Sequence, residues 1–371
     1  MAGELAGVVA GIVDTHIHQW DPLRTPREAS AAARVYRLAP RVVERLVRVV
    51  LAQPERELVL TAQHVARHYL PEDYAADASQ VAATVGVGID AVVHVEAGWH
   101  AKGPLAPAGE TRWVAALPFG RAGAPRLGAI VAHADLRSKD CAELLDAHLA
   151  ASAKVSGIRH MGARHRDPKV KDWTDQDGLL ASRDFLAGFA QLADRGLTFD
   201  AWVYSGQLTD VATLAREYPE TTIVLDHYGT PVGLFGPMGA ATGRTVAARA
   251  AMMRAWRDDI AALAQQPNVV AKHSGLAFPP LGFGHERSGN IGDRQTLAEL
   301  MAPLIDHVTD VFGPDRLMFG SNYPMDKPNA SLATIIGALA DVLAPRGDDL
   351  LRKVFRDNAA RIYRLDDSGT S

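Results

Sequence analysis

The sequence predicts an α/β fold, a closed (β/α)8 TIM barrel, and three observations support this prediction. Eight short apolar segments recur along the 371 residues, each followed by a loop and a stretch with helical spacing. The β-branched content of these segments suits strands buried on both faces of a parallel sheet. Polar and ionisable residues gather where the segments end, which is where α/β barrels place their chemistry.

The predicted strands alternate with predicted helices over the whole length of the chain. They are expected at residues 11–18, 89–96, 128–133, 155–160, 197–203, 222–227, 269–273 and 317–321. Helical spacing lies between them, as in Phe185, Phe189 and Leu192. Residues 8–365 are therefore predicted to form one barrel domain.

Three connections are too long for simple loops. Residues 19–88 separate the first two strands, and we interpret 23–70 as a helical insertion near the barrel mouth. The segments 228–250, rich in glycine, and 276–296, with aromatic residues, follow strands six and seven. Long loops of this kind often serve as lids, so we expect both to lie over the site.

Composition narrows the class of protein. Hydrophobic residues make up 47% of the chain, charged residues 22%, and the net charge is -4. No long basic run suggests nucleic acid, and no apolar run approaches the ~20 residues that span a bilayer. The N-terminus lacks a secretory pattern, and a single cysteine fits a reducing compartment. We predict a cytoplasmic protein with a small-molecule substrate; its oligomeric state is open, with a homodimer as the common arrangement.

Two histidines one residue apart, His16 and His18, end the first predicted strand. On a strand they project from one face, with α-carbons about 6.5 Å apart. Two imidazoles so placed can hold one cation or the two ends of a polarised group. A pair of surface histidines is the simpler interpretation, but the other strand ends repeat the pattern.

Ionisable and aromatic residues at or near the other strand ends are further candidates. We expect seven of these residues to bind the substrate: Arg159, His160, Trp202, Lys272, His273, Trp20 and Tyr323. Taken singly, each could be an ordinary core residue, and Lys272 could form a Schiff base or neutralise a substrate acid. Together they favour a site, because packing alone gives no reason for a buried strand to end in a charge eight times.

Six ordered motifs make the chain resemble the amidohydrolase superfamily, in particular the branch with fuconolactonase-like and pyrone-dicarboxylate lactonase-like proteins. The motifs are Val13-Asp14-Thr15-His16-Ile17-His18-Gln19-Trp20-Asp21-Pro22, Gly157-Ile158-Arg159-His160, Leu225-Asp226-His227-Tyr228-Gly229-Thr230-Pro231, Lys272-His273-Ser274-Gly275-Leu276, Met318-Phe319-Gly320-Ser321-Asn322-Tyr323-Pro324 and Asn358-Ala359-Ala360-Arg361-Ile362-Tyr363. The resemblance implies a barrel enzyme that hydrolyses cyclic esters, although other members decarboxylate or hydrate aromatic-derived acids.

The resemblance also implies roles for single residues. His16 and His18 would bind a metal ion or the substrate, His227 would join them, and Arg159 would hold a substrate carboxylate. Family members either hold one divalent ion, often zinc, or work without metal. A zinc ion would take its third ligand from His227 or Glu96 and would activate water. Without metal, the histidines would donate hydrogen bonds to the carbonyl oxygen.

One position departs from the family pattern. The eighth strand usually carries an aspartate that acts as general base, and here that residue is Asn322. An amide cannot take a proton from water near neutral pH. Asp326 is the nearest replacement, and Glu96 and Asp226 are rivals. The leading hypothesis is a hydrolase that opens a lactone or related cyclic ester of a carboxylated small molecule by activated water. The alternatives are a metal-dependent lyase (decarboxylase or hydratase) on an aromatic-derived carboxylic acid, and a binding protein that has lost its chemistry.

Overall fold

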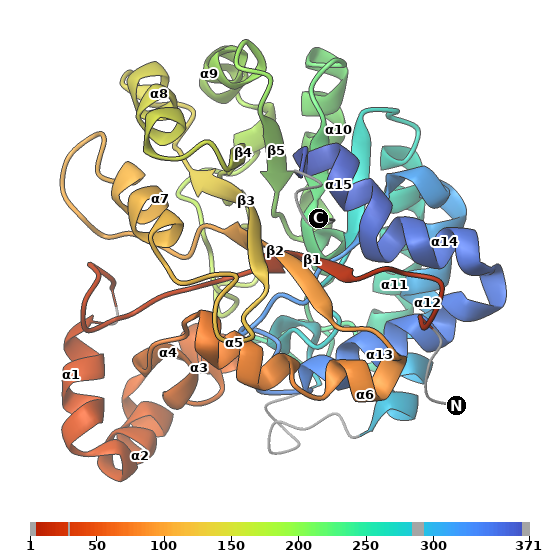
Figure 1. Ribbon diagram of the computed structural model, residues 1–371, viewed down its shortest axis with the longest axis horizontal. Coiled ribbons are helices and arrows are strands. Elements are labelled where there is room, and N and C mark those ends of the chain that lie inside the picture. Colours follow the sequence, from red (N-terminus) through yellow and green to blue (C-terminus); the bar gives the residue numbers. More distant parts are fainter. Residues whose placement is uncertain (1–4, 29, 284–292, 366–371) are drawn as a thin grey trace.

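A computed structural model of the chain describes residues 5–28, 30–283 and 293–365, and it contains one barrel. Eight parallel strands follow one another in chain order, each hydrogen-bonded to the next. They are β1 (Ile12–Ile17), β2 (Ile89–Val95), β3 (Arg126–His133), β4 (Val155–Arg159), β5 (Thr198–Ala201), β6 (Ile223–Leu225), β7 (Val269–His273) and β8 (Leu317–Phe319). Helices surround the sheet (Figure 1), and the predicted fold class is confirmed.

The first and last strands meet and bring the ends of the sheet together. The Thr15 hydroxyl donates to the carbonyl oxygen of Phe319 at 2.6 Å, and the Asn322 N–H donates to the His16 carbonyl at 2.8 Å. A parallel bridge joins Ile17 to Tyr323. These bonds place the segment after β8 beside the two histidines of β1.

The helices fall into an insertion and an outer layer. Between β1 and β2 lie α1 (Ser30–Leu38), α2 (Pro40–Val50), α3 (Gln53–Val59), α4 (Gln63–Ala66), α5 (Pro71–Ala78) and α6 (Val81–Val85). The outer layer continues with α7 (Ala108–Ala115), α8 (Cys141–Ala151), α9 (Arg183–Ala193), α10 (Leu208–Glu217), α11 (Val246–Leu263), α12 (Arg294–Phe312), α13 (Leu332–Leu343), α14 (Asp348–Arg352) and α15 (Asn358–Tyr363). Among the described residues, none of these helices combines the length and apolar character that a membrane span requires.

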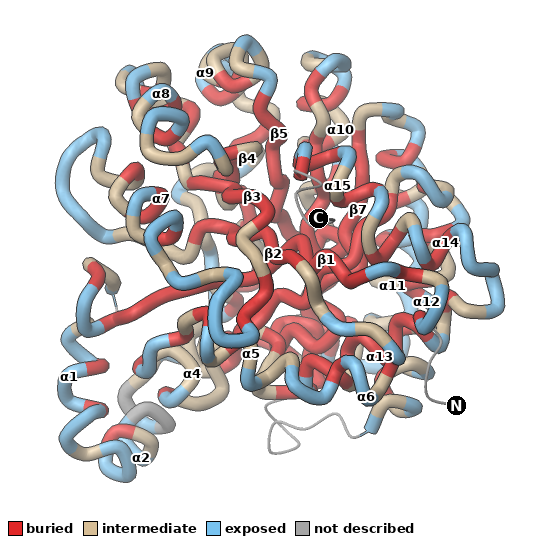
Figure 2. The backbone as a smooth tube through the Cα atoms, in the orientation of Figure 1, coloured by how far each residue is buried: buried red, intermediate tan, exposed pale blue. Residues whose placement is uncertain are grey.

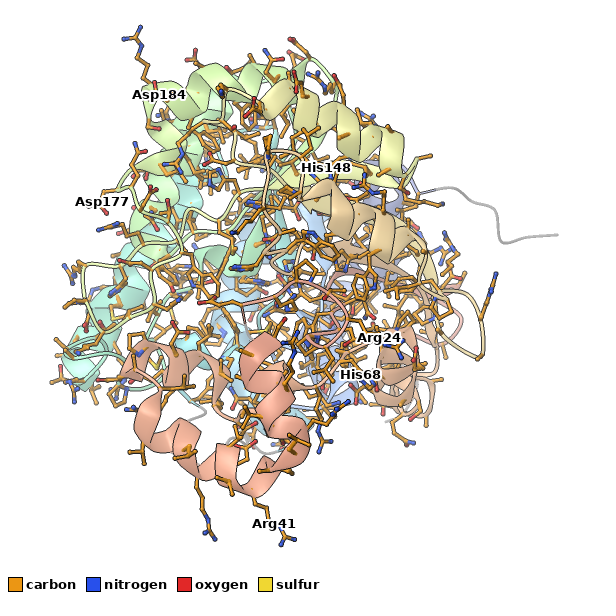
Figure 3. The ribbon with its side chains drawn as sticks, turned by 90° about the vertical axis from the view of Figure 1, so that its left-hand side faces the viewer. Arg24, Arg41, His68, His148, Asp177 and Asp184 are labelled. Carbon is orange, nitrogen blue, oxygen red and sulfur yellow. The ribbon has the colours of Figure 1, made fainter. Side chains whose placement is uncertain are left out.

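The first two helices of the insertion stand away from the barrel. Figure 3 shows this hairpin at the edge of the molecule, with Arg41 pointing outward. By contrast, α3 lies against the short 3-10 helix Pro279–Leu281 that follows β7. The insertion therefore reaches the barrel mouth through α3. Within the predicted loop 276–296, residues 284–292 lie outside the described part of the chain.

Alternation along the strands builds two apolar layers, and the strands are the most buried part of the molecule (Figure 2). Ile130 and Phe199 pack outward against the helices. Val13, Val93 and Met318 pack inside the barrel with Tyr363 of α15. Small apolar residues and the C-terminal helix thus fill one end of the barrel interior, which leaves the other end for polar side chains.

Candidate active site

A buried lysine lies at the centre of the polar end of the barrel. Side chains two residues apart on a strand share one face. Lys272 of β7 therefore points into the barrel as Val270 does, and Asp226, directly after β6, points inward as Val224 does. Lys272 Nζ lies 2.5 Å from Asp200 Oδ2 and 3.2 Å from Asp226 Oδ1, and all three side chains are fully buried. Burial raises the pKa of Asp200 to about 6, even though Lys272 opposes the shift.

His16 lies between two cations. Its Nδ1 atom is 3.3 Å from Lys272 Nζ and 3.3 Å from Asp226 Oδ1, while its Nε2 atom is 3.4 Å from Arg159 Nη1. Burial and then the charge of Lys272 lower the pKa of His16 well below its usual value. His16 is therefore a neutral imidazole whose two nitrogens both face functional groups.

His227 adopts a backbone conformation that few residues other than glycine adopt. Its φ is 51°, in a short 3-10 segment, Asp226–Gly229, immediately after β6. Strain of this kind is concentrated at functional sites. A β-carbon on Gly275 would come within 2.9 Å of the His227 side chain, so glycine is needed there. The Ser274 hydroxyl, 2.8 Å from Nδ1, fixes the ring 4.5 Å from that of His16.

Arg159 is already paired with a carboxylate. Its Nε donates to Glu96 Oε1 at 2.8 Å, and its Nη2 donates to the Glu96 carbonyl oxygen at 2.8 Å. Burial alone would raise the pKa of Glu96, but Arg159 outweighs it and holds the pKa at about 2. The guanidinium that we expected to hold a substrate carboxylate is thus neutralised by the protein itself.

The donor atoms near His16 fit a divalent metal ion. Among the described residues, His16, Asp226 and His227 offer ligand atoms that all lie within 4.8 Å of one another. Both carboxylate oxygens of Asp226 are buried without a hydrogen bond, since their contacts to the cations fail hydrogen-bond geometry. Two imidazoles and one carboxylate form a familiar catalytic zinc donor set.

Two residues predicted as metal ligands have other partners. His18 Nδ1 is 2.9 Å from the Val95 carbonyl oxygen, and its Nε2 is 3.4 Å from Asn322 Oδ1. Glu96 is bound to Arg159. Asp226, which we expected to act as a base, joins His16 and His227 in their place.

The polar end of the barrel has no ion pair at Asn322, which follows β8. The Asn322 backbone has a φ of 57°, and the side-chain Nδ2 lies 2.7 Å from Asp326 Oδ1. The Ala277 N–H donates to Asp326 Oδ2 at 2.8 Å. Asp326 is fully buried, and burial raises its pKa to about 8. Asp326 thus lies behind Asn322, away from the cluster of His16, His227 and Asp226.

Two of the predicted substrate-binding residues lie outside this cluster. The His273 side chain turns outward from β7, and its Nδ1 is hydrogen-bonded to the Tyr228 hydroxyl at 2.6 Å. His160 packs on Phe185, and its Nδ1 is 3.7 Å from an oxygen of Asp135. Burial lowers the pKa of His160 to about 4.

The three predicted aromatic residues are divided between the site and its surroundings. Trp202 is near the site, with its ring 6.3 Å from that of His227. The Trp20 indole donates to the Arg67 carbonyl and so supports the insertion. The Tyr323 hydroxyl donates to the carbonyl of Ala330, so this hydroxyl is not directed at the cluster of His16, His227 and Asp226.

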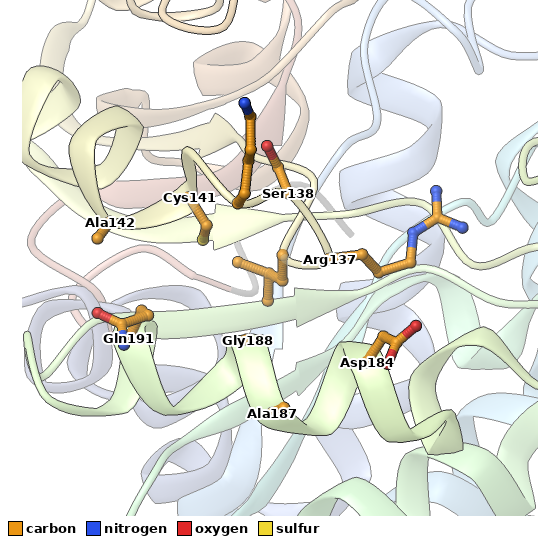
Figure 4. Close-up of a pocket in the computed structure, with 10 residues that line it drawn as sticks. Arg137, Ser138, Cys141, Ala142, Asp184, Ala187, Gly188 and Gln191 are labelled. Atoms are coloured by element: carbon orange, nitrogen blue, oxygen red, sulfur yellow. The ribbon is translucent and has the colours of Figure 1, made fainter.

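The α3 helix closes the mouth of the barrel. Gln53 Nε2 donates to the Gly239 carbonyl, and Glu57 Oε2 accepts the Gly239 N–H, both at 2.8 Å. A small pocket of about 10 Å³ lies between α3 and the loops after β4, β5, β6 and β7. A larger cavity of about 370 Å³ (Figure 4) lies between the loop after β3 and α9, and it contains none of the predicted site residues.

Comparison with known proteins agrees with this architecture. The model of the family described as Amidohydrolase matches residues 13–365. The chain belongs to the amidohydrolase family. It is thus a hydrolase, as the sequence predicts.

Two curated relatives and one solved structure illustrate the similarity. A protein of Sinorhizobium fredii, described as uncharacterized protein y4mH, is 31% identical over 80% of this chain and 86% of its own. An L-fucono-1,5-lactonase of Burkholderia ambifaria is 32% identical over 65% of this chain and 71% of its own. A Burkholderia multivorans amidohydrolase crystallised with bound zinc has a TM-score of 0.67 at 24% identity, covering 96% and 100% of the two chains.

Three residues that contact the cluster were given no predicted role. Asp200 binds Lys272, Tyr363 donates to Asp200 at 3.0 Å, and Ser274 orients His227. Asp200 lies within the predicted strand 197–203, and the other two lie in motifs that carry the family resemblance. Their positions were therefore visible in the sequence, but their partners depend on contacts between distant segments.

Proposed function

We propose that the chain hydrolyses an uncharged lactone and that Asp226 accepts the proton of the attacking water. One observation carries this assignment. Asp226 holds a buried carboxylate beside His16 and His227 whose oxygens accept no hydrogen bond, although Lys272 Nζ lies 3.2 Å from one of them. A carboxylate left in this state is available to a water molecule or a metal ion.

The reaction needs an activated water and a stabilised oxyanion. Asp226 takes one proton as the water oxygen bonds to the carbonyl carbon. Arg159 and Lys272, whose nitrogens lie 3.8 and 3.2 Å from Asp226, stabilise the negative charge that develops. The ring C–O bond then breaks as the leaving oxygen takes up the proton that Asp226 accepted, so that a hydroxy acid forms and the carboxylate is regenerated.

The ion pairs of the site favour an uncharged ring. Arg159 and Lys272 already face three carboxylates, Glu96, Asp200 and Asp226, so a substrate carboxylate would add a fourth negative charge to two cations. This makes the aromatic-acid lyase, and a carboxylated lactone, weaker candidates. Relatives named L-fucono-1,5-lactonase support a sugar-derived 1,5-lactone.

We propose zinc as the ion for the donor set of His16, His227 and Asp226, and the zinc-bound relative supports this choice. A divalent ion held there would lower the pKa of a bound water and polarise the carbonyl. The chain's own groups would still orient the ring and stabilise the negative charge that develops on its carbonyl oxygen.

The test measures the hydrolysis of a panel of sugar 1,5-lactones through the protons that the hydroxy acid products release. The protein is assayed both after treatment with a chelator and after addition of zinc. Asp226→Asn should lower kcat/KM by about 10²–10⁴-fold, while the surface variant Asp146→Asn should not. Elemental analysis of the wild type and of Asp226→Asn measures the metal that each protein binds. An unchanged rate in Asp226→Asn, or carbon dioxide release from an aromatic acid, would refute the proposal.

A further inference from the structure

The α1–α2 hairpin carries apolar side chains that no described part of the chain covers. Leu38 and Val49 are 81% exposed, and Val35, Val42 and Leu46 are 50–56% exposed. They are five of the nine large apolar side chains exposed among the described residues, and we call them the hairpin stripe. Single exposed apolar residues are ordinary, but a group of them on one element marks an interaction surface.

The exposed residues of α2 lie on one side of the helix. Val42, Leu46 and Val49 follow the spacing i, i+4, i+7, which brings them next to one another. Val43 lies on the adjacent inner side and packs in a small core with Tyr36 of α1. The insertion therefore covers only part of the apolar side of α2 and leaves the rest to solvent.

The charges that accompany the stripe are almost all positive. Residues 30–50 contain five arginines and one glutamate, a net charge of +4 in a chain whose net charge is -4. The carboxylate of Glu44 is turned to the insertion itself, where it accepts the N–H groups of Ala62 and Gln63. Four arginine side chains of the hairpin are exposed and form no ion pair within the described part of the chain: Arg34, Arg37, Arg41 and Arg45.

An apolar stripe bordered by arginines fits the surface of an anionic membrane. A helix that lies in the bilayer interface buries its apolar side at the level of the headgroups, while its basic residues attract the lipid phosphates. Such a helix does not span the bilayer. The hairpin stands at the edge of the molecule with Arg41 pointing outward (Figure 3), so a flat surface can approach it.

Protein partners fit this surface less well. If two copies paired through the same stripe, the arginines of one hairpin would face those of the other, and like charges oppose such a contact. A contact with a different face of a second copy would be head-to-tail and would extend into filaments unless it closed into a ring. The stripe consists of valine and leucine alone, which are under-represented among the residues that carry the binding energy of protein interfaces.

We propose that the α1–α2 hairpin binds membrane surfaces rich in anionic lipid, with the hairpin stripe inserted among the headgroups and the arginines on the phosphates. The apolar contact and the charge contribute together, so loss of either one weakens binding. This binding is independent of the proposed lactone hydrolysis.

The first test is co-sedimentation of the whole chain with two kinds of lipid vesicle. One contains equal parts of phosphatidylglycerol and phosphatidylcholine, and the other contains phosphatidylcholine alone. We expect binding to the anionic vesicles that is at least about tenfold tighter than to the neutral ones. Binding should weaken as salt rises from about 0.1 M to about 1 M, because salt screens the arginines.

Two pairs of variants separate the apolar and the charged contributions. Val49→Asp should weaken binding at least about tenfold, whereas Val246→Asp, which changes a valine 75% exposed on α11, should bind as the wild type does. Removing two hairpin arginines together, Arg41→Gln with Arg45→Gln, should weaken binding about 30-fold. The control for charge is Arg254→Gln with Arg257→Gln, two exposed arginines of α11.

The molar mass in solution, measured by light scattering for the wild type and Val49→Asp, distinguishes the other occupants. A wild type that does not bind anionic vesicles overturns the proposal. If that protein is a dimer that Val49→Asp dissociates, a second copy covers the stripe instead. Equal binding to both kinds of vesicle, or equal losses in Val49→Asp and Val246→Asp, also contradicts the proposal.

Discussion

The two sides of the polar end of the barrel bury their polar side chains in different ways. On the side formed by β2 and β4 to β7, two cations are paired with three carboxylates: Arg159 contacts Glu96, and Lys272 lies between Asp200 and Asp226. On the side formed by β1 and β8, His18, Asn322 and Asp326 are joined by contacts of 3.4 and 2.7 Å with no ion pair. The polar groups on both sides have partners, but only the side of β2 and β4 to β7 uses ion pairs.

This difference indicates where the chemistry lies. An unpaired buried charge costs several kcal/mol, so buried charges are kept where they are paired or used. The charged side retains one carboxylate, Asp226, whose oxygens have no hydrogen bond. The neutral side has no such group among its described residues, so it is suited to holding His18 in place.

Removing the central cation should have the largest effect. Lys272→Met leaves Asp200 and Asp226 facing each other without a counter-charge, and we expect a loss of about 3–5 kcal/mol in the free energy of unfolding. Because the pKa of Asp200, about 6, is raised, Asp200 can take up a proton in acid. The loss should therefore be larger at pH 8 than at pH 5, as measured by chemical denaturation.

A matched control is Tyr363→Phe, which removes only the hydroxyl that donates to Asp200. It should cost about 1 kcal/mol, the usual net value of one hydrogen bond. Equal losses in the two variants would show that the charged side is held by packing rather than by its ion pairs.

The fold could be predicted from the sequence because its signals are local. Apolar segments such as Val269–His273, followed by helical spacing, predict strands and helices without knowledge of their partners. The position of α3 over the barrel mouth could not be predicted in this way. It depends on pairs such as Glu57 with Gly239, which are 182 residues apart.

The site was predicted less completely, and for a physical reason. A strand end shows that a residue is near the rim, but the direction of its side chain depends on alternation. Lys272 and His273 are neighbours, and only Lys272 points inward. Pairing is harder still, since nothing in the sequence of Arg159 or Glu96 indicates that each neutralises the other.

A neutral substitution on the charged side should change substrate preference. Glu96→Gln removes the carboxylate that balances Arg159, so the guanidinium would become available to a substrate acid. A hydrogen bond to a charged group contributes about 1.5–3 kcal/mol, so kcat/KM for a carboxylated lactone should rise by about 10–100-fold relative to an uncharged one. Competition between the two lactones measures this ratio. An unchanged ratio would mean that the Arg159–Glu96 pair does not set selectivity.

Adding an acid to the neutral side should have a smaller effect that depends on pH. In Asn322→Asp, two buried carboxyls would lie where the present side chains are 2.7 Å apart, and they could share one proton but could not both ionise. Their pKa values would be raised, so stability should fall as pH increases. For an added penalty of about 1–2 kcal/mol in a chain of this length, we expect the Tm to drop between pH 6 and pH 9 by about 1–3 °C more than in the wild type. Thermal unfolding at each pH, with Asn329→Asp as a second buried amide-to-acid control, measures this difference.

The same variant decides whether the eighth strand lacks its base. If Asp226 is the proton acceptor, Asn322→Asp should not increase lactone hydrolysis, because the new carboxyl is protonated or shared with Asp326. A gain of tenfold or more would show that the missing aspartate limits the reaction, and it would favour a binding protein that has lost its chemistry. The Tm and the rate together therefore test whether the charge was lost from this side without loss of function.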